Sequence, residues 1–197
     1  MYVSSRIGFI IALLMLISAC NSNNANTKST EKNTSKTEAE LLADGDSMAT
    51  TAQRNLLMQV SSAIQKGGTD YAISYCNENA MLLTDSVAQK YHTNIQRLSD
   101  KNRNPKNAIM LEEDKVAWEK IKQLKTHFIQ VNNKGETYYY KPIALAMPTC
   151  LKCHGTQNDI PLSTQRLIQA NYPNDKATNY TLGELRGMWK IQLATAQ

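Results

Sequence analysis

The hydrophobic pattern of the chain changes character twice along its length. Residues 7–17 form an unbroken apolar run, whereas residues 21–37 contain no aliphatic side chain larger than alanine. From residue 48 onwards, apolar positions recur at regular spacings. The pattern therefore predicts one folded region over 48–197, preceded by a short apolar segment and a polar stretch.

The first part of the folded region has the spacing of helices. Apolar residues three or four apart predict helices over 48–66 and 70–91, with Ser47 able to cap the first. The glycine pair at 67–68 separates them. The apolar stripe of the second helix contains Cys76, and its other members are Ile73, Ala80, Leu83 and Val87. Cys76 is therefore expected to face the interior.

The later part mixes helices with strands. Helical spacing returns at 111–125 and 162–170. Strands are predicted within 94–108 and at 128–131, 137–146 and 186–193. An Asn-Asn-Lys-Gly sequence suits the turn of a hairpin between the second and third of these strands. Helices followed by an antiparallel hairpin and a final strand indicate an α+β domain.

The first residues have the features of an export signal. Arg6 precedes an apolar run that is much shorter than the roughly 20 residues a membrane-spanning helix needs, and small residues follow the run. The sequence Ile-Ser-Ala-Cys at 17–20 resembles the lipobox of bacterial lipoproteins, in which the signal is removed and the cysteine is lipidated. We therefore expect a signal peptide over 1–19 and a lipid anchor on Cys20. The alternative is an ordinary signal peptide that contains a cysteine.

The polar stretch has the composition of a tether. Twelve of the 17 residues in 21–37 are Asn, Ser or Thr, which bury too little apolar surface to offset chain entropy. The lipidated cysteine and a disordered tether are expected over 20–47. The residue after the cysteine is Asn21 and not the aspartate linked to inner-membrane retention, which favours a periplasm-facing place on the outer membrane.

Composition and charge narrow the class of protein. The 197 residues carry 22 Lys and Arg against 17 Asp and Glu, and the resulting charge of +5 is too small and too scattered to indicate nucleic-acid binding. Four cysteines are too few for a disulfide scaffold at this length, so each must be interpreted by its position.

The most informative motif is Cys150-Leu-Lys-Cys153-His154, the attachment sequence of c-type haem. Two thiols at this spacing can each form a thioether to a vinyl group on one edge of the porphyrin. The adjacent imidazole of His154 then lies under the iron as the proximal ligand. Export supports this interpretation, because c-type haem is attached outside the cytoplasm. We expect one covalently attached haem c.

Three other interpretations of the motif fit the sequence less well. A zinc site would need a second ligand pair, for which only Cys76 with His92 or His127 is available. A thioredoxin-like dithiol would open a helix in a βαβ unit, whereas Pro148 is expected to lead out of a hairpin strand. A structural disulfide in so small a loop is uncommon.

The second axial ligand of such a haem is open from residue types alone. The candidates are Cys76, His92, His127, Met147, Met188 or no residue at all. Methionine and histidine are frequent partners of histidine in cytochromes c, while an unpaired inward-facing cysteine is by default a small buried hydrophobe.

A family resemblance covers roughly residues 48–197. Tyr75-Cys76-Asn77, the segment 97–107 with its Arg-Asn-Pro-Lys-Asn sequence, and the motif at 150–154 occur in the order seen in a bacterial family of haem c domains, the Tll-like type. The resemblance implies a PAS-like fold, with N-terminal helices on an antiparallel sheet. It also implies that a cysteine thiolate from an early helix is the distal iron ligand, which here is Cys76.

The expected function follows from this ligand set. A thiolate opposite histidine lowers the reduction potential, and two filled axial positions disfavour catalysis. Arg97, Lys101 and Arg103 are candidates for contacts with the haem propionates. We expect an electron carrier or a sensor of redox state or diatomic gas that acts with a separate redox or signalling protein. A thiol–disulfide oxidoreductase using Cys150 and Cys153 is the alternative.

Overall fold

The computed structural model describes residues 36–193, which belong to one compact unit of the chain, 33–197. The predicted signal peptide at 1–19, Cys20 and the tether as far as residue 35 lie outside the described residues. Among the residues that are described, no helix combines the length and apolar character needed to cross a membrane.

The first element is α1 (Glu38–Lys90), which begins ten residues before the predicted start. Thr37 caps it: its hydroxyl accepts from the backbone N–H of Glu40, whose carboxylate accepts in return from the N–H of Thr37. The helix is interrupted at Gly67 and Gly68, where the backbone leaves helical geometry and Gly68 has a φ of 71°. The predicted break at this glycine pair is therefore confirmed.

The predicted tether over 20–47 is wrong for its last ten residues. They form the first turns of α1, so that Ser47 lies inside the helix and does not cap it. Gly45 packs against the ring of Tyr139, where an added Cβ would lie 2.3 Å from Cγ of the ring. Small residues allow this close approach while burying little apolar surface, which explains why the hydrophobic pattern did not reveal the helix.

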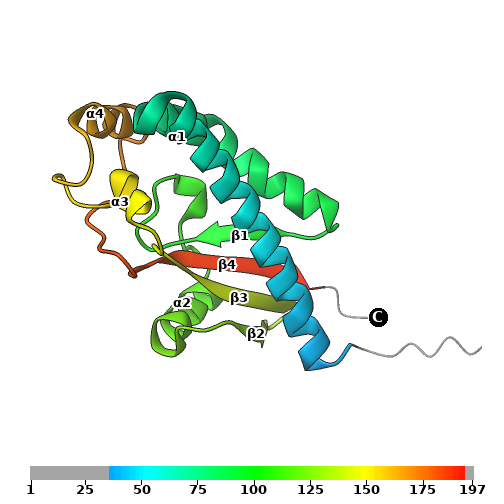
Figure 1. Ribbon diagram of the computed structural model, residues 1–197. Coiled ribbons are helices and arrows are strands. Elements are labelled where there is room, and N and C mark those ends of the chain that lie inside the picture. The colour runs from blue at the N-terminus through cyan, green and yellow to red at the C-terminus, as the bar shows by residue number, and fades with distance from the viewer. Residues whose placement is uncertain (1–35, 194–197) are drawn as a thin grey trace, which may run out of the picture. The chain divides into compact units, whose positions relative to one another are not determined.

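Four strands form one antiparallel sheet in the order β1-β4-β3-β2 (Figure 1). They are β1 (Ile95–Leu98), β2 (Phe128–Val131), β3 (Thr137–Ala144) and β4 (Leu185–Leu193). The hairpin predicted between β2 and β3 is present, and the last strand lies between β1 and β3. The predicted α+β class with helices on an antiparallel sheet is confirmed.

Helices cover both faces of the sheet. The first half of α1 packs on one face through Ala49 and Ala52, against Tyr139 and Trp189. On the other face lies α2 (Glu112–Leu124), whose Ala117, Trp118 and Ile121 contact Phe128, Tyr140 and Met188. Since both faces are covered, β4 is buried at consecutive positions from Gly187 to Ile191.

The two short helices that follow β3 in the chain lie beside the second half of α1 (Figure 1). The 3₁₀ turn η1 (Pro105–Asn107) follows β1, α3 (Pro148–His154) follows β3, and α4 (Leu162–Asn171) packs on α1. A small apolar cluster that includes Ile73 joins α1 to α4. This arrangement places the cysteine motif opposite α1.

Candidate cofactor site

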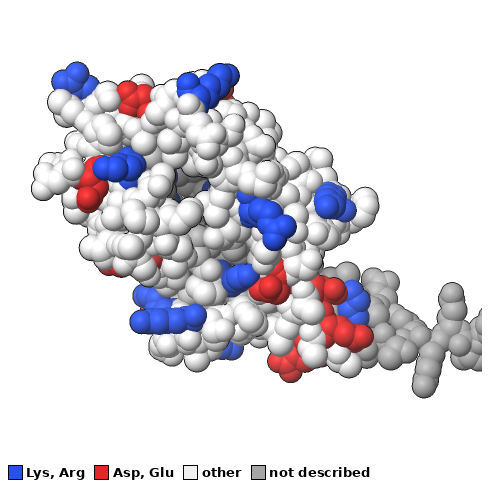
Figure 2. Space-filling view, in the orientation of Figure 1, with Lys and Arg blue, Asp and Glu red and all other residues white. Residues whose placement is uncertain are grey.

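A cavity of about 510 Å³ lies between α1, α3 and the sheet, and its volume is in the range of cofactor pockets. Figure 2 shows the hollow, with mostly uncharged atoms around its mouth. Most of its lining is apolar, and both halves of α1 contribute to it with Leu56, Leu57, Val60, Ile64, Ala72 and Ile73. Such a lining suits a large, flat, apolar ligand.

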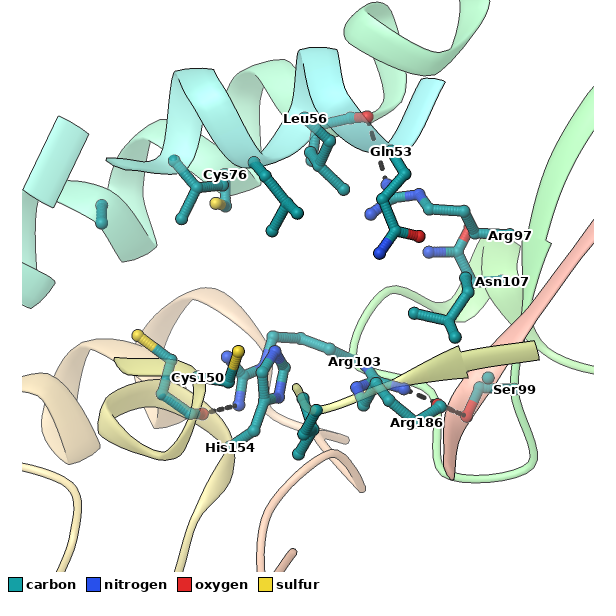
Figure 3. Close-up of a pocket in the computed structure, with 18 of the residues that line it drawn as sticks. Gln53, Leu56, Cys76, Arg97, Ser99, Arg103, Asn107, Cys150, His154 and Arg186 are labelled. Carbon is teal, nitrogen blue, oxygen red and sulfur yellow. Dashed lines mark hydrogen bonds between the residues drawn. The ribbon is translucent and has the colours of Figure 1, made fainter. Parts of the chain in front are cut away.

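The motif residues Cys150, Cys153 and His154 all line this cavity (Figure 3). They lie on α3, where Pro148 occupies the first turn. Pro148 follows the hairpin strand β3 as expected, and the chain turns there into α3, so that the motif lies on a short helix. The sheet is antiparallel, however, so the βαβ setting of a thioredoxin-like dithiol is missing from the described part of the chain.

His154 is held in one orientation. Its Nδ1 lies 2.8 Å from the carbonyl oxygen of Ala177, and because a carbonyl can only accept, Nδ1 carries the proton. Burial, together with the charges of Arg103 and Arg186, holds the pKa of His154 well below its ordinary value. The imidazole is therefore neutral with a lone pair on Nε2, which is the form that binds a metal.

Arg103 holds α3 in place through hydrogen bonds and an ion pair. Its Nη2 donates to the backbone oxygen of Cys153 at 2.7 Å and to Oδ2 of Asp175 at 3.0 Å. The side chains of this ion pair are 10% and 8% exposed. Arg103 lines the cavity, but its charge is already paired with Asp175.

The other two predicted propionate contacts differ from each other. Arg97 lines the cavity, where its Nη2 donates to the carbonyl of Ala80 at 3.1 Å and its Nε is buried without a partner in the described residues. Lys101 is not among the lining residues, and its ammonium lies 3.9 Å from the ring centre of Tyr180. The cavity therefore includes Arg97 and leaves out Lys101.

Arg186 lines the cavity and was not singled out from the sequence. It lies near the start of β4, and its Nη1 donates to Oγ of Ser99 and to the carbonyl of Lys101, both at 3.0 Å. A charged residue at the end of a strand normally indicates a solvent-facing position, so the sequence carried no signal for this role.

Cys76 lines the wall opposite His154, on the second half of α1 (Figure 3). Burial raises the pKa of its thiol, although the charges of Arg97 and Arg103 act in the opposite direction. The interior position predicted from the helical stripe is therefore confirmed.

Most other candidates for a second axial ligand lie elsewhere. His92 and His127 are exposed, and Met188 is buried beneath α2 on the opposite face of the sheet. Met147 does line the cavity, but it directly precedes α3, the helix that carries His154. Cys76 is thus the candidate that faces His154 from a separate element.

The geometry also bears on the two alternative chemistries. Burial raises the pKa of the Cys153 thiol to about 11, so this thiol is protonated at neutral pH and is not suited to be the attacking thiolate of a dithiol. Within residues 36–193, no three His, Cys, Asp or Glu side chains gather as ligands for a bare metal ion. Neither a redox dithiol nor a zinc site is favoured.

The fold and the cavity define a small α+β domain that presents a CxxCH helix to an apolar pocket. Residues 20–194 match the model of the Tll0287-like family, and the chain belongs to that family. Among solved structures, that of the cyanobacterial haem protein Tll0287 is similar in fold, with a TM-score of 0.61 and 23% identity. The match covers 80% of this chain and 96% of that chain. No protein of curated function matches this sequence.

Proposed function

We propose that the protein binds one haem c in the cavity between α1 and α3, as a monohaem cytochrome-like protein. The observation that carries the proposal is that α3 presents the two cysteines and the histidine of an attachment motif to an apolar cavity of cofactor size. The haem protein named in the structural match supports the same cofactor. The residues present fit this group: the proton on Nδ1 of His154 leaves Nε2 free for iron, and apolar side chains line the walls.

Cys150 and Cys153 would hold the group covalently. Each thiol would form a thioether with one vinyl group, an addition of S and H across the C=C bond that would need no external oxidant or reductant. When bound, the haem supplies an iron that cycles between ferric and ferrous states. The raised pKa of the Cys153 thiol ceases to matter after attachment, because a thioether does not ionise.

His154 and Cys76 would be the two axial ligands. The bond from His154 to Ala177 increases the basicity of the imidazole and fixes its ring. Coordination would keep Cys76 as a thiolate, against the effect of its burial, and would lower the reduction potential compared with a methionine ligand. Loss of Cys76 from the iron, on reduction or on binding of a small gas, is the proposed switch.

We infer a role in electron transfer or in sensing redox state or a diatomic gas, and not in catalysis, since two protein ligands would occupy both axial positions. The partner would be a separate redox or signalling protein. The lipobox resemblance at 17–20 supports a lipid anchor on Cys20 in the cell envelope, facing the periplasm.

The pyridine haemochrome spectrum tests the proposal. The protein is produced together with a haem-attachment system, and the spectrum is recorded after acid extraction of non-covalent haem. We expect the band of a haem with two thioether bonds, which shifts when Cys150→Ser removes one of them. Absence of covalent haem, combined with reversible oxidation of Cys150 and Cys153 to a disulfide, would support the oxidoreductase alternative instead.

The anchor is tested separately in a bacterial host. Cys20→Ala is expected to move the protein from the membrane fraction to the soluble periplasmic fraction, whereas Ser18→Ala is expected to leave it in the membrane. If Cys20→Ala stays membrane-bound like the control, the anchor proposal fails, whatever the haem content.

A further inference from the structure

Three arginines line the cavity, and they differ in how their charge is balanced. Arg103 is paired with Asp175. For Arg97 and Arg186, no carboxylate oxygen of the described residues 36–193 lies within 4.0 Å of the guanidinium. Two positive charges therefore face the same cavity without a counter-ion from this part of the chain.

The hydrogen bonds of these two arginines go to neutral acceptors. Arg97 donates to the Ala80 carbonyl, and Arg186 donates to Oγ of Ser99 and to a backbone carbonyl. These bonds satisfy some N–H groups but supply no negative charge, and Nε of Arg97 keeps no partner at all in the described residues. Burial lowers the pKa of both guanidiniums, as expected for charges that have lost water without gaining a carboxylate. Unpaired buried charges are costly, so a ligand that brings anions would be stabilised here.

The positions of the arginines match the shape of haem. In Figure 3, Cys150 and His154 lie toward one end of the cavity, while Arg97 and Arg186 come from strands toward the other end. The vinyl groups of haem are on one edge of the porphyrin, and its two propionates are on the opposite edge. Attachment at Cys150 and Cys153 would therefore direct the propionates away from α3.

We propose that Arg97 and Arg186 are the pair that binds the two haem propionates, while Arg103 braces α3 and Lys101 takes no part. This inference rests on the proposed haem function. It identifies Arg186, which the sequence did not indicate, and it assigns separate roles to the three arginines of the cavity. It also makes Arg97 a link between a propionate and the distal helix, since Ala80 follows Cys76 by about one turn of α1.

The test uses the holoprotein with Arg97→Gln and Arg186→Gln, and with Arg166→Gln on the exposed side of α4 as the matched control. Resonance Raman spectra report hydrogen bonding to the propionates through their bending band. Each cavity variant is expected to shift this band. Each should also move the reduction equilibrium toward ferric iron by about threefold or more, because a nearby positive charge that stabilises the ferrous state is lost. The control should match the wild type in both readouts.

Lysine variants keep the proposal testable if a glutamine variant fails to mature. Arg97→Lys and Arg186→Lys retain the charge but lose the planar fork. They should still shift the propionate band, but their ratio of ferrous to ferric protein should be close to that of the wild type. A propionate band that is unchanged in all four cavity variants would overturn the inference. If the wild-type protein nevertheless carries covalent haem, the proposed function stands and only the assignment of the propionate contacts fails.

Discussion

The two helices that face each other across the cavity differ in how their cavity-facing residues are held in place. The proximal helix α3 has only seven residues, and directional bonds fix it: Arg103 bonds to Cys153, His154 bonds to Ala177, and the N–H of Tyr180 donates to the carbonyl of His154. The second half of α1 also has hydrogen bonds to other segments, between Thr69, Asp70 and Thr164, between Tyr75 and Gln59, and between Ala80 and Arg97. None of the side-chain hydrogen bonds among the described residues involves Cys76, which lies one turn from the apolar cluster around Ile73.

This difference indicates which of the two helices can shift its position more easily. Hydrogen bonds and buried ion pairs lose much of their energy when their geometry changes, whereas apolar contacts are non-directional and tolerate small shifts. Under the proposed function, we therefore expect His154 to stay in place and Cys76 to be the ligand that is released. The predictions below test this contrast.

The largest effect is expected at Arg103, whose hydrogen bond to Cys153 and ion pair with Asp175 hold α3 in place. Arg103→Gln leaves the carboxylate of Asp175 buried without its partner, which should lower the free energy of unfolding by about 3–5 kcal/mol. Urea denaturation of the holoprotein measures this loss. Lys115→Gln, which breaks an exposed ion pair with Glu112, should cost less than about 1 kcal/mol. Equal losses of unfolding free energy in the two variants would contradict the claim that Arg103 holds α3 in place.

A smaller effect is expected from the distal wall. Ile73 is 2% exposed, and Ile73→Val should cost about 0.5–1.5 kcal/mol of unfolding free energy. The loosened helix should also let carbon monoxide bind the ferrous protein faster, which flash photolysis measures. Leu82→Ala, at an exposed position of the same helix, should change neither quantity appreciably. Carbon monoxide binding that is unaffected by Ile73→Val would argue against a yielding distal wall.

The smallest effect is expected at Lys101, which lies on Tyr180 and outside the cavity wall. Lys101→Met should cost about 0.5–1 kcal/mol through the lost cation–π contact. Its reduction equilibrium should equal that of the wild type in a spectroelectrochemical titration. A shift as large as that of Arg186→Gln would show that Lys101 belongs to the site after all.

The sequence predicted the parts of this molecule that have strong local signals. The CxxCH spacing, the glycine pair at 67–68 and the stripe through Cys76 are all local patterns, and the structure contains each of them. The start of α1 was missed because its only large apolar residues, Leu41 and Leu42, are adjacent, and its closest contact with the sheet is made by Gly45, so the hydrophobic pattern there is weak.

The arginine roles could not be predicted, for a different reason. Arg97, Lys101 and Arg103 are close in sequence and equal in charge, and only tertiary contacts separate them: Asp175 pairs with Arg103, and the Tyr180 ring holds Lys101 outside the cavity. Arg186 joins them through the pairing of β4 with β1, a contact between residues almost a hundred positions apart. No local pattern records such a contact.

The EPR spectrum of the ferric holoprotein tests most directly the central claim that His154 and Cys76 face each other across one haem. The account predicts a low-spin spectrum with a thiolate signature, which Cys76→Ala removes and Met147→Leu preserves. A spectrum that is the same in Cys76→Ala as in the wild type would contradict it.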